Sequence, residues 1–136
     1  MSAAKNAEIA KEFYDRFLAD DLEGMGKTQT DDVVWTICPG PAADVVPYFG
    51  VFRGREGYMD CINRYLESAE PEVFELTGYY GDADKAFVTG HEKVLAKATG
   101  KRFETDFLIV FDIHDDKITR LTGYFDSALL MAAFTA

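Results

Sequence analysis

The chain has 136 residues, of which 48% are hydrophobic and 14% aromatic, and its 24 acidic and 14 basic residues give a net charge of −10. This length and apolar content fit a single folded domain spanning residues 1–136 and exclude disorder driven by composition. Because a strongly negative surface repels phosphate backbones and anionic lipids, we expect neither nucleic acid nor membrane partners.

The segment from Met1 to Glu8 lacks the long apolar stretch of a secretory signal, and no run of residues is apolar enough to span a bilayer. The two cysteines, Cys38 and Cys61, are too few for a disulfide framework and lack metal-ligand spacing. No glycine-rich phosphate loop is present. We therefore expect a cytoplasmic protein with reduced thiols, no metal and no cofactor.

The first segment predicts an amphipathic helix, with Ile9, Phe13, Phe17 and Leu18 assigned to its apolar face. Asp20 and Asp21 are candidate N-caps for a short second helix. Residues 33–38 are rich in β-branched and aromatic types and predict a strand, followed by a loop to about residue 50. Helical spacing resumes near residue 54 and predicts a helix that Pro71 ends.

From residue 72 onward the apolar residues alternate with polar ones, which predicts strands. We expect strands at about 72–80, 85–98, 103–113 and 118–126, with turns at 81–84, 99–101 and 114–117. A short helix is expected at 127–134. Helices first and an antiparallel meander afterwards indicate an α+β fold, with the helices on one face of a curved sheet.

Four stretches resemble one known family: residues 31–35 (DDVVW), the loop 39–50, residues 52–57 (FRGREG) and the ending 116–126 (DKITRLTGYFD). Their order is similar to that of the SnoaL-like, ketosteroid-isomerase-related family. The resemblance implies the nuclear transport factor 2-like fold, a cone-shaped, mostly antiparallel sheet with helices packed on its concave face. It also implies a homodimer formed through the outer face of the sheet.

The characterised relatives suggest different chemistries. Ketosteroid isomerases use a tyrosine acid and an aspartate base, whose positions match Phe13 and Ile37 here, and neither side chain moves a proton. The Asp-Arg-Asp arrangement of limonene epoxide hydrolases maps onto Lys93, His91 and Asp126, so only Asp126 is kept. SnoaL-type polyketide cyclases place an acid/base aspartate at the end of the last strand, which again matches Asp126.

If the cone closes as in these relatives, we expect His91 and Asp126 to point into one cavity, as a catalytic acid/base pair. The remaining residues expected in the pocket or in substrate binding are Tyr14, Phe17, Trp35, Tyr58, Lys93, Phe107 and Tyr124. Three structural alternatives stay open. Asp126 suits an N-cap, His91 a hydrogen-bonded strand position, and Lys93 a solvated surface position.

The resulting hypothesis is a cofactor-independent enzyme of isomerase, dehydratase or polyketide-cyclase type that acts on a small apolar carbonyl compound. One alternative is a non-catalytic binding module for a small hydrophobic ligand. Another is an epoxide-hydrolase-like enzyme with an altered catalytic dyad.

Overall fold

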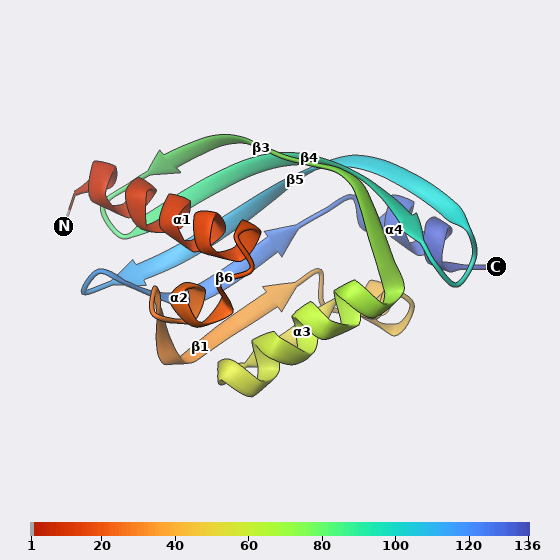
Figure 1. Ribbon diagram of the computed structural model, residues 1–136, viewed down its shortest axis with the longest axis horizontal. Coiled ribbons are helices and arrows are strands. Elements are labelled where there is room, and N and C mark those ends of the chain that lie inside the picture. Colours follow the sequence, from red (N-terminus) through yellow and green to blue (C-terminus); the bar gives the residue numbers. More distant parts are fainter. Residues whose placement is uncertain (1) are drawn as a thin grey trace.

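The computed structural model describes residues 2–136, which form one six-stranded sheet and four α-helices (Figure 1). The first half of this part contains α1 (Ala3–Leu18), α2 (Leu22–Gly26), β1 (Gln29–Ile37), the 3-10 helix η1 (Pro41–Asp44), β2 (Gly50–Arg53) and α3 (Gly54–Ser68). The second half contains β3 (Ala69–Gly81), β4 (Lys85–Ala96), β5 (Lys101–His114), β6 (Lys117–Tyr124) and α4 (Ser127–Phe134).

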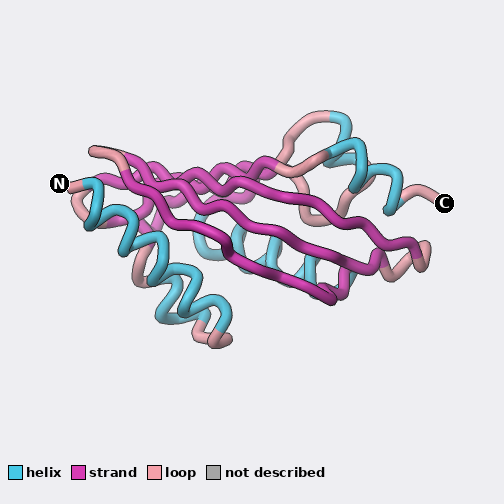
Figure 2. The backbone as a smooth tube through the Cα atoms, turned by 90° about the horizontal axis from the view of Figure 1, so that it is seen from above, coloured by secondary structure: helices cyan, strands magenta, loops and turns pink. Residues whose placement is uncertain are grey.

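The strands lie in the order β2-β1-β6-β5-β4-β3. Only β1 and β6 run parallel, and every other neighbouring pair is antiparallel. Figure 2 shows the strands as one twisted, bent layer with α1 against one side. The predicted α+β fold with a curved, mostly antiparallel sheet is therefore confirmed.

Local sequence explains where the first helix begins and which face it buries. The Ser2 hydroxyl accepts a hydrogen bond from the backbone N–H of Lys5 and caps α1. Phe13 is buried as predicted, but Leu18 is 56% exposed. Because nine helical residues turn the chain by about 900°, Leu18 lies opposite Ile9, so its assignment to the apolar face was wrong.

The sheet differs from the sequence prediction mainly at its edges. β2 is four residues long and lies between the predicted end of the loop, at about residue 50, and the predicted start of the helix near residue 54. β1 begins at Gln29, four residues before the predicted strand. The predicted helix α3 does end before Pro71, at Ser68. Pro71 itself lies inside β3, where an edge strand tolerates the missing N–H. No helix within residues 2–136 is long and apolar enough to cross a membrane.

Candidate active site

A cavity of about 110 Å³ lies between the inner face of the sheet and the helices α1 and α3. Nine of its fifteen lining residues are aromatic, and one, Glu92, carries an ionisable carboxyl group. The lining residues are Phe13, Tyr14, Phe17, Trp35, Ile37, Tyr48, Cys61, Ile62, Tyr65, Phe74, Glu92, Phe107, Ile109, Leu121 and Phe125.

Stacked phenylalanine rings form one wall of this cavity. Phe107 stacks on Phe74 and on Phe125, with ring centroids 5.4 Å apart in each pair. Phe107 lies opposite Gly90 in the pairing of β4 with β5. A Cβ atom on Gly90 would come within 2.1 Å of the Phe107 ring, so a glycine is needed for the ring to lie across the strand.

Glu92 is the acid of the cavity. Its position on β4 faces inward, as do Val88, Gly90 and Val94, and its side chain is only 2% exposed. Across the sheet it pairs with Phe74 of β3 and Thr105 of β5. Because burial penalises the charged form, the pKa of Glu92 is raised to about 7, although nearby His91 opposes the shift. Such a carboxyl group can both accept and donate a proton near neutral pH.

Three tyrosines share this cavity with Glu92. The hydroxyl oxygens of Tyr48 and Tyr65 are buried and have no hydrogen-bond partner in the described residues. Their rings meet edge to face, with centroids 4.9 Å apart. Burial and the charge of Glu92 raise the pKa of Tyr14, Tyr48 and Tyr65, so all three phenols stay protonated near neutral pH. Tyr48 and Tyr65 therefore offer two uncommitted hydrogen-bond donors to a ligand.

Trp35 of β1 also lines the cavity, and two contacts hold its ring in place. Its indole Nε1 donates to the side-chain oxygen of Gln29 at 2.7 Å, and its ring stacks on Tyr58 at 5.1 Å between centroids. Gln29 and Tyr58 are both buried. These contacts fix one wall of the pocket before any ligand binds.

The four predicted aromatic wall residues Tyr14, Phe17, Trp35 and Phe107 do line the cavity. Tyr58 is buried against Trp35, but it is not among the residues that line this cavity. Tyr124 is 55% exposed, because β6 directs it outward while its neighbours Gly123 and Leu121 are buried. Tyr124 was expected in the pocket, but it lies outside it.

His91 and Lys93 lie on the outer face of β4, because they alternate with the inward-facing Glu92. His91 Nδ1 is 2.7 Å from Asp106 Oδ1, and His91 Nε2 is 2.8 Å from Glu104 Oε2. These hydrogen bonds raise the pKa of His91. Lys93 is exposed. Neither side chain reaches the cavity, so His91 and Lys93 lie outside the pocket in which they were expected.

Asp126 is exposed and forms the N-cap of α4, where its Oδ1 accepts a hydrogen bond from the backbone N–H of Leu129 at 3.2 Å. The expected meeting of His91 and Asp126 in one cavity does not occur. The sheet separates His91 from the interior, and the cap turns Asp126 toward the helix.

Sequence reasoning missed Glu92, Tyr48 and Tyr65. The signal for Glu92 was available, because it occupies the same alternation as Val88, Gly90 and Val94, where an acid is out of place in an apolar series. Tyr48 lies in a connection and Tyr65 near the end of α3, so their approach to β4 depends on how distant elements pack.

Within residues 2–136, no group of three or more His, Cys, Asp or Glu side chains is placed to hold a metal ion. Both thiols are free. Burial raises the pKa of Cys61 to about 12 and also raises the pKa of Cys38. Neither thiol is therefore activated as a nucleophile.

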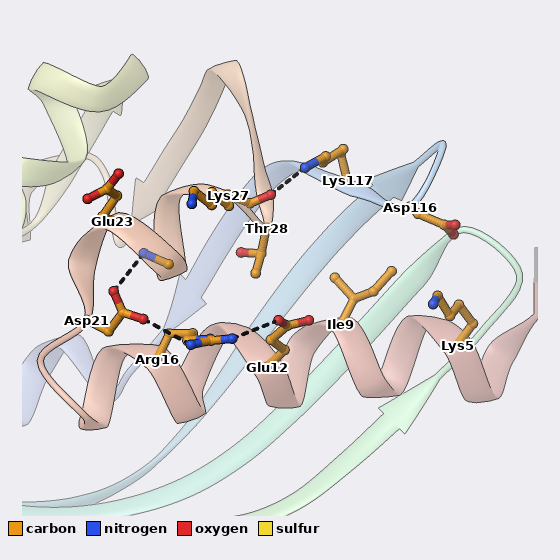
Figure 3. Close-up of a pocket in the computed structure, with 11 residues that line it drawn as sticks. Lys5, Ile9, Glu12, Arg16, Asp21, Glu23, Lys27, Thr28, Asp116 and Lys117 are labelled. Carbon is orange, nitrogen blue, oxygen red and sulfur yellow. Dashed lines mark hydrogen bonds and ion pairs between the residues drawn. The ribbon is translucent and has the colours of Figure 1, made fainter.

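A second, polar cleft of about 400 Å³ lies outside, between α1, α2 and the turn joining β5 to β6 (Figure 3). Four basic and four acidic side chains line it. Arg16 pairs with Glu12 and Asp21. Since its charges of both signs balance, this cleft has no feature that selects a ligand.

The curved sheet, its helices and the apolar cavity between them define a class of small α+β pocket proteins. The SnoaL-like domain family matches residues 10–121, and the chain belongs to that family. The resemblance expected from the sequence is thus confirmed. No curated protein matches this chain.

Solved structures show the same fold. An NTF2-like protein from Burkholderia xenovorans is 23% identical, with a TM-score of 0.87 and 99% of both chains covered. A protein from Mesorhizobium loti, proposed to be a SnoaL-like polyketide cyclase, is 26% identical, with a TM-score of 0.70, and covers 87% of this chain and 97% of its own. TerC, co-crystallised with polyporic acid, is 20% identical, with a TM-score of 0.78, and covers 97% of this chain and 99% of its own.

Proposed function

We propose that this protein is a cofactor-independent enzyme that moves a proton to or from carbon in a small, mostly apolar carbonyl compound. The reaction is of isomerase, dehydratase or cyclase type. The observation that carries this proposal is Glu92, a buried carboxyl group with a pKa of about 7 in an aromatic cavity. The relative from Mesorhizobium loti, proposed to be a polyketide cyclase, supports the same class of chemistry.

In the proposed mechanism the ionised Glu92 carboxylate removes a proton from the carbon next to the substrate carbonyl. Negative charge then develops on the carbonyl oxygen. The free hydroxyls of Tyr48 and Tyr65 donate hydrogen bonds to that oxygen and stabilise the enolate. The protonated Glu92 returns the proton to the same or another atom. The apolar walls exclude water and strengthen these interactions.

The size of the cavity limits the substrate. A cavity of about 150 Å³ is known to hold benzene, and this one measures about 110 Å³. We therefore expect substrates, or reacting portions of substrates, of roughly four or five non-hydrogen atoms.

Deuterium exchange tests the proposal without knowledge of the natural substrate. Acetone and butanone are incubated with the protein in D₂O, and loss of the α-proton signals is followed by NMR. We expect exchange to increase with pH through about 7, because the ionised form of Glu92 is the base. Glu92→Gln should slow exchange at least about a hundredfold.

Glu75→Gln is the matched control, because Glu75 is an exposed residue of β3 paired with the outward-facing His91. It should exchange at the rate of the unmodified protein. Exchange that persists in Glu92→Gln, or its absence with both ketones, would contradict the proposal.

A second candidate function is non-catalytic binding of a small apolar ligand. It is favoured by the lining of the cavity, because no other residue that lines it carries a carboxyl group or an imidazole. Ligand binding without any deuterium exchange would support this function over catalysis.

The proposed assembly is a homodimer formed through the outer face of the sheet. Leu108 and Val110 are half-buried on this face of β5 and would gain cover from a second copy. With Cys38 and Cys61 both free, a reducing compartment such as the cytoplasm is the proposed location. Sedimentation analysis tests the dimer, since a species of 15.2 kDa would be a monomer.

A further inference from the structure

The charge of Glu92 has no counter-ion in the pocket. None of the other lining residues is a lysine, arginine or histidine, and no hydrogen bond or ion pair to Glu92 is found within residues 2–136. Buried carboxylates in proteins are normally paired, because an unpaired one loses its hydration without compensation. A ligand that brings a positive charge would supply the missing partner.

The surroundings of Glu92 also favour a cation. The rings of Tyr14, Phe17, Trp35 and Phe107 line the same cavity, and aromatic rings attract ammonium groups through their negative faces. The net charge of −10 raises the concentration of cations near the surface.

We propose that the cavity binds small organic ammonium ions, held by the carboxylate of Glu92 within the aromatic walls. The volume of about 110 Å³ suits an ion the size of tetramethylammonium, which has five non-hydrogen atoms. This ligand class is different from the carbonyl compounds of the proposed reaction, and the binding does not require that reaction to occur. In an active enzyme the ammonium ion would compete with the substrate.

Binding should depend on pH through Glu92. The titratable groups that line the cavity with it are the phenols of Tyr14 on α1, Tyr48 before β2 and Tyr65 on α3, with the thiol of Cys61 on α3. Glu92 has the lowest pKa of this group, because burial raises all of the others well above neutrality. The ammonium ion pairs with ionised Glu92, so its affinity should increase as pH rises through about 7 and reach a plateau above it.

Trp35 provides the readout, because it is the single tryptophan of the chain and lines the cavity. Its fluorescence is titrated with tetramethylammonium chloride at about pH 8.5, with sodium chloride keeping the ionic strength constant. The comparison ligand is tert-butanol, which has the same number of non-hydrogen atoms and a similar shape but no charge. We expect tetramethylammonium to bind at least about tenfold more tightly than tert-butanol.

Two variants assign the effect to the carboxylate. Glu92→Gln should weaken tetramethylammonium binding at least about tenfold and should not weaken tert-butanol binding. Glu75→Gln, which removes the same charge from the outer face, should leave both affinities unchanged.

Equal affinity for the two ligands, no saturable binding of tetramethylammonium, or full affinity in Glu92→Gln would each overturn this inference. The ketone exchange assay separates it from the proposed function. Tetramethylammonium binding without ketone exchange would refute only the proposed enzyme activity. Ketone exchange without tetramethylammonium binding would refute only the ammonium site.

Discussion

Alternation along β4 decides which of three adjacent polar residues reaches the pocket. His91 and Lys93 face outward, whereas Glu92 faces inward and is 2% exposed. In the same strand Gly90 leaves room for the Phe107 ring, so a residue without a side chain shapes the wall beside the acid. Two inward-facing positions of β4 therefore determine this part of the site. Glu92 supplies the acid, and Gly90 leaves room for the aromatic ring that forms the wall.

Gly90→Ala should disrupt the cavity. Because a Cβ would lie within 2.1 Å of the ring, Phe107 must move and lose its stacking on Phe74 and Phe125. We expect the free energy of unfolding to fall by roughly 1–3 kcal/mol and ketone exchange to be lost. Urea unfolding and the exchange assay measure the two effects. Lys93→Ala, on the outer face of the same strand, is the control and should change neither the stability nor the exchange rate. Unaltered exchange in Gly90→Ala would contradict the role given to Gly90 in shaping the cavity wall.

At the scale of elements, the end of β6 and the start of α4 have a structural role. Asp126 accepts a hydrogen bond from the backbone N–H of Leu129, and α4 buries Leu130 and Ala133 against the rest of the protein. The side chain of Asp126 thus stabilises the helix that closes this end of the sheet.

Asp126→Ala should lower the free energy of unfolding by about 1 kcal/mol, because the first turn of α4 loses its cap. Ketone exchange should be retained, since Asp126 lies outside the cavity. Asp126→Asn keeps a capping oxygen and should restore the stability in thermal unfolding. Loss of exchange in Asp126→Asn with stability intact would instead support a direct role of this carboxylate in catalysis.

Elements with a strong local signal could be predicted from the sequence. The long strands β4 and β5 and the turn at Asp115 and Asp116 follow from apolar alternation and from residues that tolerate a positive φ. The short strand β2 could not be predicted, because its four residues are defined by pairing with β1. The aromatic walls were largely predictable, whereas Glu92 was overlooked in favour of the imidazole next to it.

At the scale of the whole molecule, the fold brings residues from distant parts of the chain around one carboxyl group. Tyr14 comes from α1, Tyr48 from the connection before β2, and Tyr65 from α3, while β4 supplies Glu92. Burial destabilises the ionised form of Glu92 and so raises its pKa. With a pKa near neutrality, the carboxyl group is suited to proton transfer at neutral pH.

An NMR titration of the glutamate side-chain carboxyl carbons in ¹³C-labelled protein tests this central claim most directly, with Glu92→Gln used to assign the signal of Glu92. The account predicts that one carboxyl resonance titrates with a pKa near 7 and is missing from the variant. If the Glu92 resonance titrates near the usual value of 4.5, the carboxyl group is not desolvated, and the proposed acid/base role is contradicted.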